Sequence, residues 1–276
     1  MNQNSSPLFL MGIRFWNQSC ERLLTELDET GGLLVVPAAP LLAQIGTDHH
    51  LREALQRADW AVVDGGYIAL LLRLLGRSVM RISGLQLLEK TVANGGSGVV
   101  PMKERKILWV TPSQAETDRI SDYLDSLSFS PEKQSYYQAP FYQKDEDFQD
   151  QDLLSLAKSV QPDWIIVCLA GGKQEKLGYF LRQHRAELTT GDHAREQGPV
   201  VLGIGAAIAF LTGGQAKIPV WADRLYLGWL FRIVENPKVY LQRYGQAFWG
   251  LPRLLWQRRH SLFNQPDPVR EANDKP

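Results

Sequence analysis

The sequence predicts an α/β protein with a Rossmann-like parallel sheet, helices on both faces of that sheet, and a C-terminal helical appendage. The first observation is that short apolar runs alternate with segments in which apolar residues recur at helical spacing. The second is that glycines follow several of the apolar runs, as in turns that lead from a strand into a helix. The third is that basic residues and tryptophans gather in the sequence after Gly213.

Bulk composition is that of an ordinary globular protein. Of the 276 residues, 44% are hydrophobic and 22% are charged, which argues against a disordered or fibrous protein. The formal net charge is zero and no nucleic-acid module is recognisable, so we expect no nucleic-acid partner. Cys20 and Cys168 are expected to be reduced, because two distant thiols make neither a disulfide framework nor a zinc site.

The sequence has no recognisable targeting or membrane-spanning segment. Its first residues lack a basic stretch followed by a sustained apolar one. No window reaches the roughly 18 uncharged apolar residues that a spanning helix needs. We therefore expect a soluble or peripheral protein.

The elements of the predicted sheet follow one another in chain order. Apolar runs of strand length predict buried strands over 32–37, 60–64, 107–110, 164–169 and 200–204. Apolar residues at helical spacing predict helices through Leu51 to Leu55, over 67–75 and over 114–127.

Changes in composition mark the loops and the domain boundaries. Residues 94–101, rich in glycine, predict a loop, and the acidic and Gln-rich residues 138–152 predict a solvated loop that leads into a helix. We expect an α/β core over 1–212, a helical appendage over 213–264 and a disordered tail over 265–276.

The appendage has an unusual composition. Residues 217–260 hold eight Lys or Arg against two acids, together with four of the eight tryptophans of the chain. Such a segment suits a surface that meets anionic lipid headgroups. It equally suits a helical unit that packs its aromatic side chains on the core.

Asp64 is the main candidate for acid–base chemistry. It ends a predicted strand and precedes two glycines, and in open α/β sheets the reactive crevice lies beyond the carboxyl ends of the strands. A carboxylate there can act as general base on a hydroxyl. It can equally cap the helix that begins near Tyr67.

Glycines after two other strands are candidates for phosphate binding. The segment Gly171-Gly-Lys-Gln-Glu175 joins a strand to a helix, where backbone N–H groups and Lys173 can face an anion. It is not a Walker A loop. Gly203 and Gly205 form a partial glycine motif that close packing of strand and helix explains as well.

We expect no metal centre, because the histidines show no metal-ligand spacing, and the pair at 49–50 is expected to start a solvated helix. The histidines are His49, His50, His184, His193 and His260.

Four segments, in order, resemble motifs of the WecG/TagA/CpsF family of glycosyltransferases, over roughly residues 30–260. "ADWAVVDG" at 58–65 resembles the family's "ADxVxxDG". The stretch from Leu74 to Gly84 resembles "LLG…R-V-x-G", and "PD…LAGGKQEK" at 162–176 resembles "PD…LGxPKQEK". The segment 221–244 resembles the terminal "W…RLxLEWLxRLxxEP…RRY".

The resemblance implies an inverting, metal-independent glycosyltransferase that needs no cofactor. Family members move a hexose or N-acetylhexosamine from a UDP-sugar to a polyprenyl-diphosphate-linked sugar in cell-wall or surface polysaccharide synthesis. The implied location is cytoplasmic and peripheral, on the inner face of an anionic membrane, and a dimer or trimer is implied.

The resemblance also implies roles for individual residues. Asp64 would be the general base, Gln174 would face the nucleotide-sugar pocket, and arginines of the appendage would stabilise the leaving diphosphate in place of a metal. The implied substrate-binding residues are Arg81, Gln86, Gly171, Gly172, Lys173, Gln174, Gly205, Arg224 and Arg232.

Several family positions are changed in this chain. Pro37-Ala38-Ala39 replaces a Thr-x-Asn, Gln86 and Ala209 each replace an aspartate, Gly172 replaces a proline and Gly228 a glutamate. One hypothesis is an active enzyme with altered donor or acceptor preference. The alternative is an inactive relative that serves as a binding or assembly subunit of a polysaccharide synthesis complex. An unrelated nucleotide-binding enzyme such as a dehydrogenase is disfavoured by the lack of a full G-x-G-x-x-G.

Overall fold

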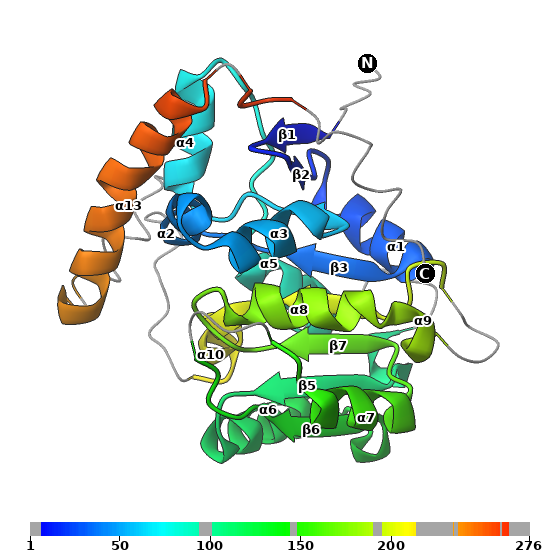
Figure 1. Cartoon of the computed structure of the whole chain (residues 1–276). Coiled ribbons are helices and arrows are strands. Elements are labelled where there is room, and N and C mark those ends of the chain that lie inside the picture. The colour runs from blue at the N-terminus through cyan, green and yellow to red at the C-terminus, as the bar shows by residue number, and fades with distance from the viewer. Residues whose placement is uncertain are drawn as a thin grey trace.

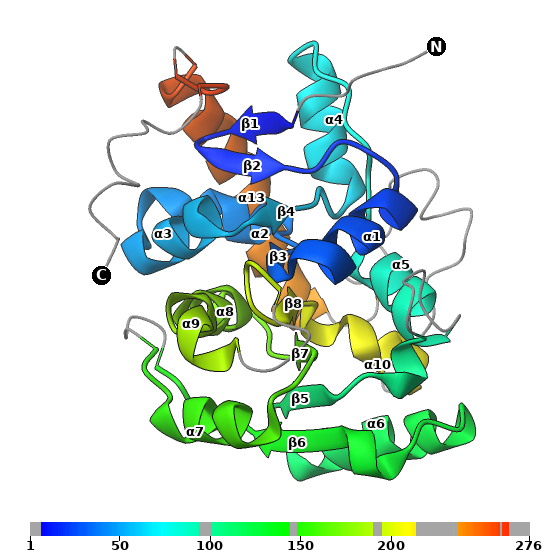
Figure 2. The same ribbon diagram turned by 90° about the vertical axis from the view of Figure 1, so that its right-hand side faces the viewer.

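A computed structural model describes residues 7–93, 101–143, 148–189, 195–213, 234, 237–259 and 261–264. The strands are β1 (Leu8–Leu10), β2 (Ile13–Phe15), β3 (Gly32–Val35), β4 (Trp60–Ala61), β5 (Ile107–Thr111), β6 (Gln134–Gln138), β7 (Trp164–Val167) and β8 (Val200–Gly203). They form one eight-stranded sheet in the order β1-β2-β4-β3-β8-β7-β5-β6 (Figure 2). All neighbours run parallel except β1 and β2. The predicted fold class is therefore confirmed.

Helices cover both faces of this sheet (Figure 2). One face carries α2 (Ala39–Leu42), α3 (His49–Arg57), α7 (Gln151–Val160), α8 (Lys173–Gln183) and α9 (Arg185–Leu188). The other carries α1 (Cys20–Thr30), α5 (Gly84–Leu88), α6 (Gln114–Ser126) and α10 (Ile208–Leu211). Short helical turns are η1 (Ala43–Gly46), η2 (Glu89–Ala93), η3 (Met102–Glu104), η4 (Pro131–Lys133) and η5 (Gly205–Ala207).

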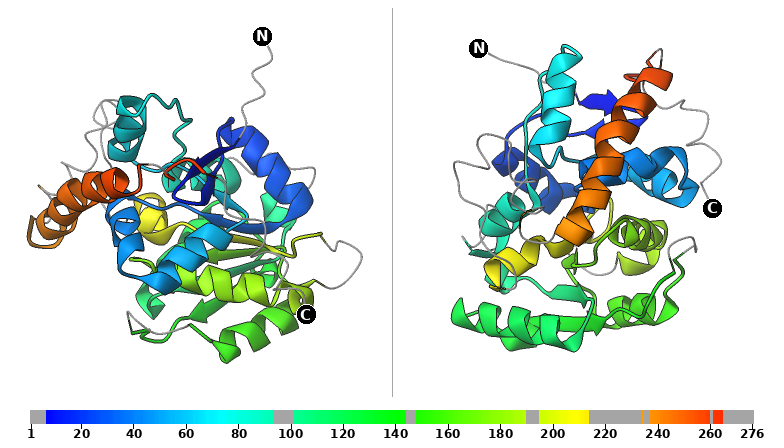
Figure 3. Two further views of the ribbon diagram at one scale, coloured as in Figure 1. Left: turned by 45° about the horizontal axis from the view of Figure 1, so that its top comes forward. Right: turned by 90° about the vertical axis from the view of Figure 1, so that its left-hand side faces the viewer.

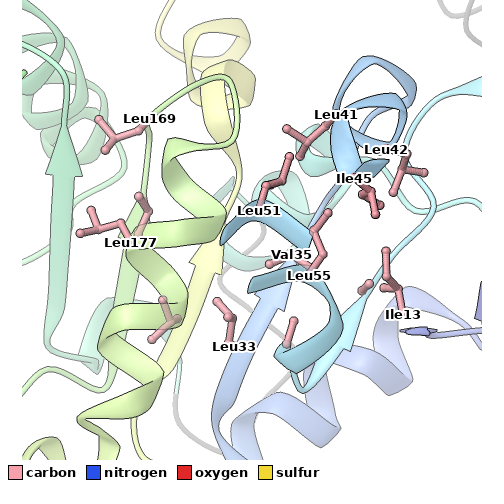
Figure 4. Close-up of a cluster of buried hydrophobic side chains, with 14 of the residues drawn as sticks. Ile13, Leu33, Val35, Leu41, Leu42, Ile45, Leu51, Leu55, Leu169 and Leu177 are labelled. Atoms are coloured by element: carbon pink, nitrogen blue, oxygen red, sulfur yellow. The ribbon is translucent and has the colours of Figure 1, made fainter. Parts of the chain in front are cut away.

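Alternation along the strands explains why their sequences are continuously apolar. Leu33 and Val35 of β3 point into one hydrophobic cluster, and Leu34 points into the other. Because both faces are buried, no position in such a strand is left for a polar residue. Figure 4 shows the first cluster between β3, α3 and α8. All five predicted strands are present, as are the three predicted helices, with ends shifted by a few residues.

Ion pairs close the amino ends of the parallel strands. Arg105, just before β5, pairs with Asp28 of α1 at 2.5 Å. Arg195, before β8, reaches the same carboxylate at 3.3 Å and donates to the carbonyl of Asp163 at 3.1 Å. These groups are largely buried, so each charge depends on its partners.

Two further helices, α4 (Gly66–Leu74) and α13 (Pro237–Gln257), lie on the side toward which the parallel strands point (Figures 1 and 3). Ala247, Leu251 and Leu255 of α13 are buried against the core, while Trp249 and Trp256 are exposed. One face of α13 therefore packs on the core, as one of the two expectations for the appendage requires, and another face is open; contact of that open face with lipid stays a prediction. In the described ranges, no helix is long and apolar enough to cross a membrane.

The prediction of a solvated loop over 138–152 that leads into a helix is correct for the helix, since α7 begins at Gln151, and wrong for part of the loop. Its first part belongs to the edge strand β6, and Tyr142, Phe148 and Asp150 are buried. Asp150 accepts hydrogen bonds from the hydroxyls of Tyr142 and, at 2.8 Å, Tyr137. Within this segment Asp150 and Tyr142 thus belong to a small buried network, whereas Gln143 and Gln149 are exposed as predicted.

Other predictions fare differently. Cys20 and Cys168 are free and buried, as expected, and α3 begins at the exposed His49. Most of the predicted loop, residues 94–100, lies outside the described residues, as does the tail 265–276.

Candidate active site

The segments that follow β3, β4, β7 and β8 meet at one edge of the sheet. These four strands are consecutive in the order β4-β3-β8-β7, and all run parallel. Their carboxyl ends therefore bring Asp64, the Gly171–Glu175 turn and Gly205 to the same side of the molecule. Arg224 and Arg232 lie outside the described residues.

Asp64 and Arg81 are brought close by the backbone. Val63, the residue before Asp64, forms a parallel bridge with Arg81, and the N–H of Ile82 donates to the Val63 carbonyl at 3.1 Å. Asp64 is partly buried. The N-cap residue of α4 is Gly65, with φ of 86°. Asp64 therefore does not occupy the helix-capping position that the sequence offered as the alternative to a general base.

Gln86 reaches the same edge through α5. A Cβ on Gly84 would lie 3.3 Å from Ala207 Cβ and 3.5 Å from the Ile204 carbonyl, so α5 packs closely on the end of β8 at this glycine. Ser83 caps α5 by accepting from the Gln86 backbone N–H at 3.1 Å. Gln86 itself is half-buried.

The helices that follow β3, β4, β7 and β8 have no capping side chain at their N-termini. Serine or aspartate side chains cap α1, α3, α5, α6 and α7. No side chain caps α2, α4, α8 or α10, whose N-cap residues are Ala38, Gly65, Gly172 and Ala207. The first N–H groups of α8, an 11-residue helix, therefore have no capping side chain, as in helices that bind anions.

Two glycines in left-handed conformation build the turn before α8. Gly171 has φ of 71° and Gly172 has φ of 86°. A Cβ on Gly172 would lie 3.2 Å from Leu41 Cδ1, whereas a Cβ on Gly171 would meet no atom within 4 Å. Figure 4 shows Leu41 and Leu51 facing the start of α8. Gly172 is thus fixed by packing, and Gly171 borders open space.

Gln174 and Glu175 form a buried polar pair behind this turn. Gln174 Nε2 donates to Glu175 Oε1 at 2.7 Å. The remaining side-chain atoms of the pair, Gln174 Oε1 and Glu175 Oε2, are buried without a hydrogen-bond partner. A Cβ on Gly205, where φ is 58°, would lie 3.3 Å from Gln174 Oε1. Gln174 therefore lies against the end of β8.

Burial determines the protonation of Glu175. Desolvation raises the pKa of its carboxyl to about 7, and the hydrogen bond from Gln174 opposes that shift only in part. No individual role for Glu175 was predicted from the sequence. The signal that could have found it is its place between Gln174, which faces the sheet, and Lys176, which faces α3.

The two lysines of this helix have different surroundings. Lys176 Nζ pairs with Asp48 at 2.9 Å, with its side chain 5% exposed, and so fastens α8 to α3. Lys173 Nζ lies 4.5 Å from the ring centre of Phe141, at the rim of the turn, and is partly exposed. Lys173 is therefore the cation of α8 that an incoming anion can reach. Among the described residues, no three His, Cys, Asp or Glu side chains converge as metal ligands.

The comparison with protein families agrees with this geometry. The model of the glycosyl transferase WecG/TagA/CpsF family matches residues 8–266. The chain belongs to this family. Among curated proteins, none matches the chain significantly. This WecG/TagA/CpsF member is accordingly a glycosyltransferase by family. The segments that carry Asp64, Arg81 and Gln174 lie at one edge of its sheet.

The first prediction concerns Glu175. Because its folded-state pKa is raised, its contribution to stability is complete below the unfolded value near 4.5 and is lost as pH rises through about 7. Replacing it by glutamine in Glu175→Gln should abolish this loss. The free energy of unfolding of the variant, relative to that of wild type, should therefore be about 3 kcal/mol higher at pH 8 than at pH 4. Urea unfolding at both pH values measures the change.

The matched control is Glu29→Gln, which removes an exposed carboxylate from α1. Its unfolding free energy should follow that of wild type at both pH values. Equal pH dependence in Glu175→Gln and wild type would show that Glu175 is not the group that titrates.

Proposed function

We propose that this protein is an inverting, metal-independent glycosyltransferase that moves a hexose or N-acetylhexosamine from a UDP-sugar to a polyprenyl-diphosphate-linked acceptor. The reaction would serve cell-wall or surface polysaccharide synthesis at the inner face of the cell membrane. The observation that carries the proposal is the shared sheet edge, where a partly buried carboxylate after β4 faces the same side as the uncapped start of α8.

The spacing of the strands supports a substrate that bridges both groups. From β4 to β7 the sheet makes three steps, or about 14 Å. An extended nucleotide sugar can bridge such a distance, with its nucleotide end at α8 and its sugar toward Asp64. The N–H groups of α8 and Lys173 would then bind phosphate oxygens.

The chemistry follows from these positions. The acceptor hydroxyl attacks the anomeric carbon, and the Asp64 carboxylate takes the hydroxyl proton. The bond from the anomeric carbon to the diphosphate oxygen breaks, and UDP leaves with that electron pair. Cations must stabilise the developing charge, and we assign this task to Lys173, together with Arg224 and Arg232 of the appendage.

One observation favours the alternative of an inactive binding subunit. The segment after β3 is apolar, since α2 begins at Ala39 with Ala38 as an N-cap residue that makes no side-chain hydrogen bond. It offers no polar side chain to a substrate. Binding of a nucleotide sugar without turnover would support this alternative over the enzyme.

The second prediction tests catalysis at Asp64. One UDP-sugar among UDP-glucose, UDP-GlcNAc and UDP-ManNAc should bind without added metal, as measured by calorimetry. Asp64→Asn should keep this affinity but lower kcat by roughly 10²- to 10⁴-fold, because the general base is lost while the fold is kept.

Asp122→Asn is the control, since Asp122 is an exposed carboxylate on α6, away from the sheet edge. It should leave kcat unchanged. Turnover in Asp64→Asn at the wild-type rate would contradict the proposed base, and absence of binding by every UDP-sugar would contradict the proposed donor class.

The third prediction uses the two glycines before α8. In both Gly171→Ala and Gly172→Ala the left-handed backbone should cost about 1–2 kcal/mol. Only Gly172→Ala adds a methyl group against Leu41 and Leu51, so it should unfold at lower urea concentration. The methyl group of Gly171→Ala points into the open space where the proposed donor phosphates lie. This variant should therefore weaken donor binding, without the further loss of stability expected for Gly172→Ala.

Calorimetry with the donor and urea unfolding of both variants separate the two effects. If Gly171→Ala binds the donor with wild-type affinity, the phosphates do not lie beside this turn.

A further inference from the structure

Exposed apolar side chains gather on two helices of this protein. Among the described residues, every large hydrophobic side chain that is exposed, except Phe141, lies either on α4 and the loop after it or on α13 and the residue Val234 before it. The first group is Leu70, Leu74, Leu75 and Met80, and the second is Val234, Leu241, Phe248, Trp249 and Trp256. Leu74 is 75% exposed and Trp249 is 78% exposed. A patch of this kind indicates an interaction surface.

Packing in the core does not explain why α4 has leucines at positions 70 and 74. Ile68, Ala69 and Leu72 are the side chains that α4 buries against the core. Leu70 and Leu74, four residues apart, lie together on another face of the helix, where they are exposed. A nine-residue helix with apolar residues all round has more apolar surface than its fold uses.

The two helices form one continuous surface. The Tyr67 hydroxyl donates to the Phe248 carbonyl at 3.1 Å, and the two rings stack with centres 5.7 Å apart. Beyond the end of α4, Arg77 lies over the ring of Phe263 at 4.6 Å. Figures 1 and 3 show α4 and α13 side by side.

This surface is basic as well as apolar. Residues 66–82 and 237–259 contain no aspartate or glutamate, although the whole chain has as many acidic as basic residues. Among the side chains that the structure describes, the arginines exposed on it are Arg73, Arg77, Arg253 and Arg259. Apolar side chains rimmed by arginine, with no acid among them, match a bilayer with anionic headgroups.

From this surface we infer that α4, a helix of the core, docks together with α13 on an anionic lipid bilayer, so that membrane contact is not left to the appendage alone. At nine residues α4 is about 14 Å long, so it lies in the interface and does not cross it. Because α4 begins two residues after Asp64, docking places the proposed base at the level of the headgroups. The inference rests on the proposed function for its purpose, but its vesicle test does not.

The test measures co-sedimentation of the full-length protein with vesicles of phosphatidylcholine and phosphatidylglycerol. Wild type should bind, and binding should weaken with added salt and with pure phosphatidylcholine. The double variant Leu70→Ser/Leu74→Ser should bind at least roughly tenfold more weakly, because it removes two apolar side chains from the interface. The variant Phe141→Ser, which changes an exposed hydrophobic residue that belongs to neither α4 nor α13, should bind as wild type does.

A second set of variants tests the role of positive charge in vesicle binding. Arg73→Gln/Arg77→Gln removes two exposed charges from this surface, and Arg119→Gln on α6 is the control. The first should lower binding and its salt dependence, and the second should change neither. Wild-type vesicle binding by the leucine double variant would overturn the inference, as would a failure of wild type to bind anionic vesicles. The inference would also be overturned if the leucine double variant changed its mass in ultracentrifugation while its vesicle binding stayed the same. The surface would then join two copies of the protein.

A parallel assay separates this inference from the proposed function. With a water-soluble acceptor, the leucine double variant should turn over at the wild-type rate. Vesicle binding by a wild-type protein that transfers no sugar would leave the docking surface standing and remove the proposed reaction.

Discussion

Burial of the parallel sheet on both faces is the constraint on which the rest of this structure depends. Side chains of β3, β5, β7 and β8 are taken up alternately by two hydrophobic clusters, so the faces of these strands hold no reactive group. Ion pairs of Arg105 and Arg195 occupy the amino edge. Polar chemistry is thereby confined to the carboxyl edge, where four helices begin without a capping side chain.

The same constraint explains what could be predicted from the sequence. Strands buried on both faces have continuous apolar runs, so β3, β5, β7 and β8 were predictable, and Asp64 could be placed at a strand end. The edge strand β6, with the sequence Gln-Ser-Tyr-Tyr-Gln at 134–138, has no such run because it pairs on one side only. For α13, composition could not decide between lipid and core, because one face of the helix is buried on the core while another exposes aromatic side chains.

Glu175 shows where sequence reasoning fails at the site itself. Its type predicts a charged surface residue, yet the packing of α8 against both the sheet and α3 encloses it, and the pKa of its carboxyl rises to about 7. The Glu175 carboxyl is tolerated at this buried position because it accepts a hydrogen bond from Gln174 and because it is protonated below its raised pKa. With an apolar Pro37-Ala38-Ala39 segment after β3, this pair is the polar group that remains at the centre of the edge.

Asp64 links the chemistry to the proposed membrane surface. Its strand ends at the sheet edge, and the next helix, α4, turns at once toward α13 and exposes Leu70 and Leu74. A polyprenyl-linked acceptor has its lipid in the bilayer and its sugar just above it. A base placed two residues before a membrane-docking helix can meet that sugar without extracting the lipid, whereas a base on a distant strand could not. If α4 docks on the membrane as proposed, the short Gly65-Gly66 connection relates acceptor access to the orientation of the whole sheet on that membrane.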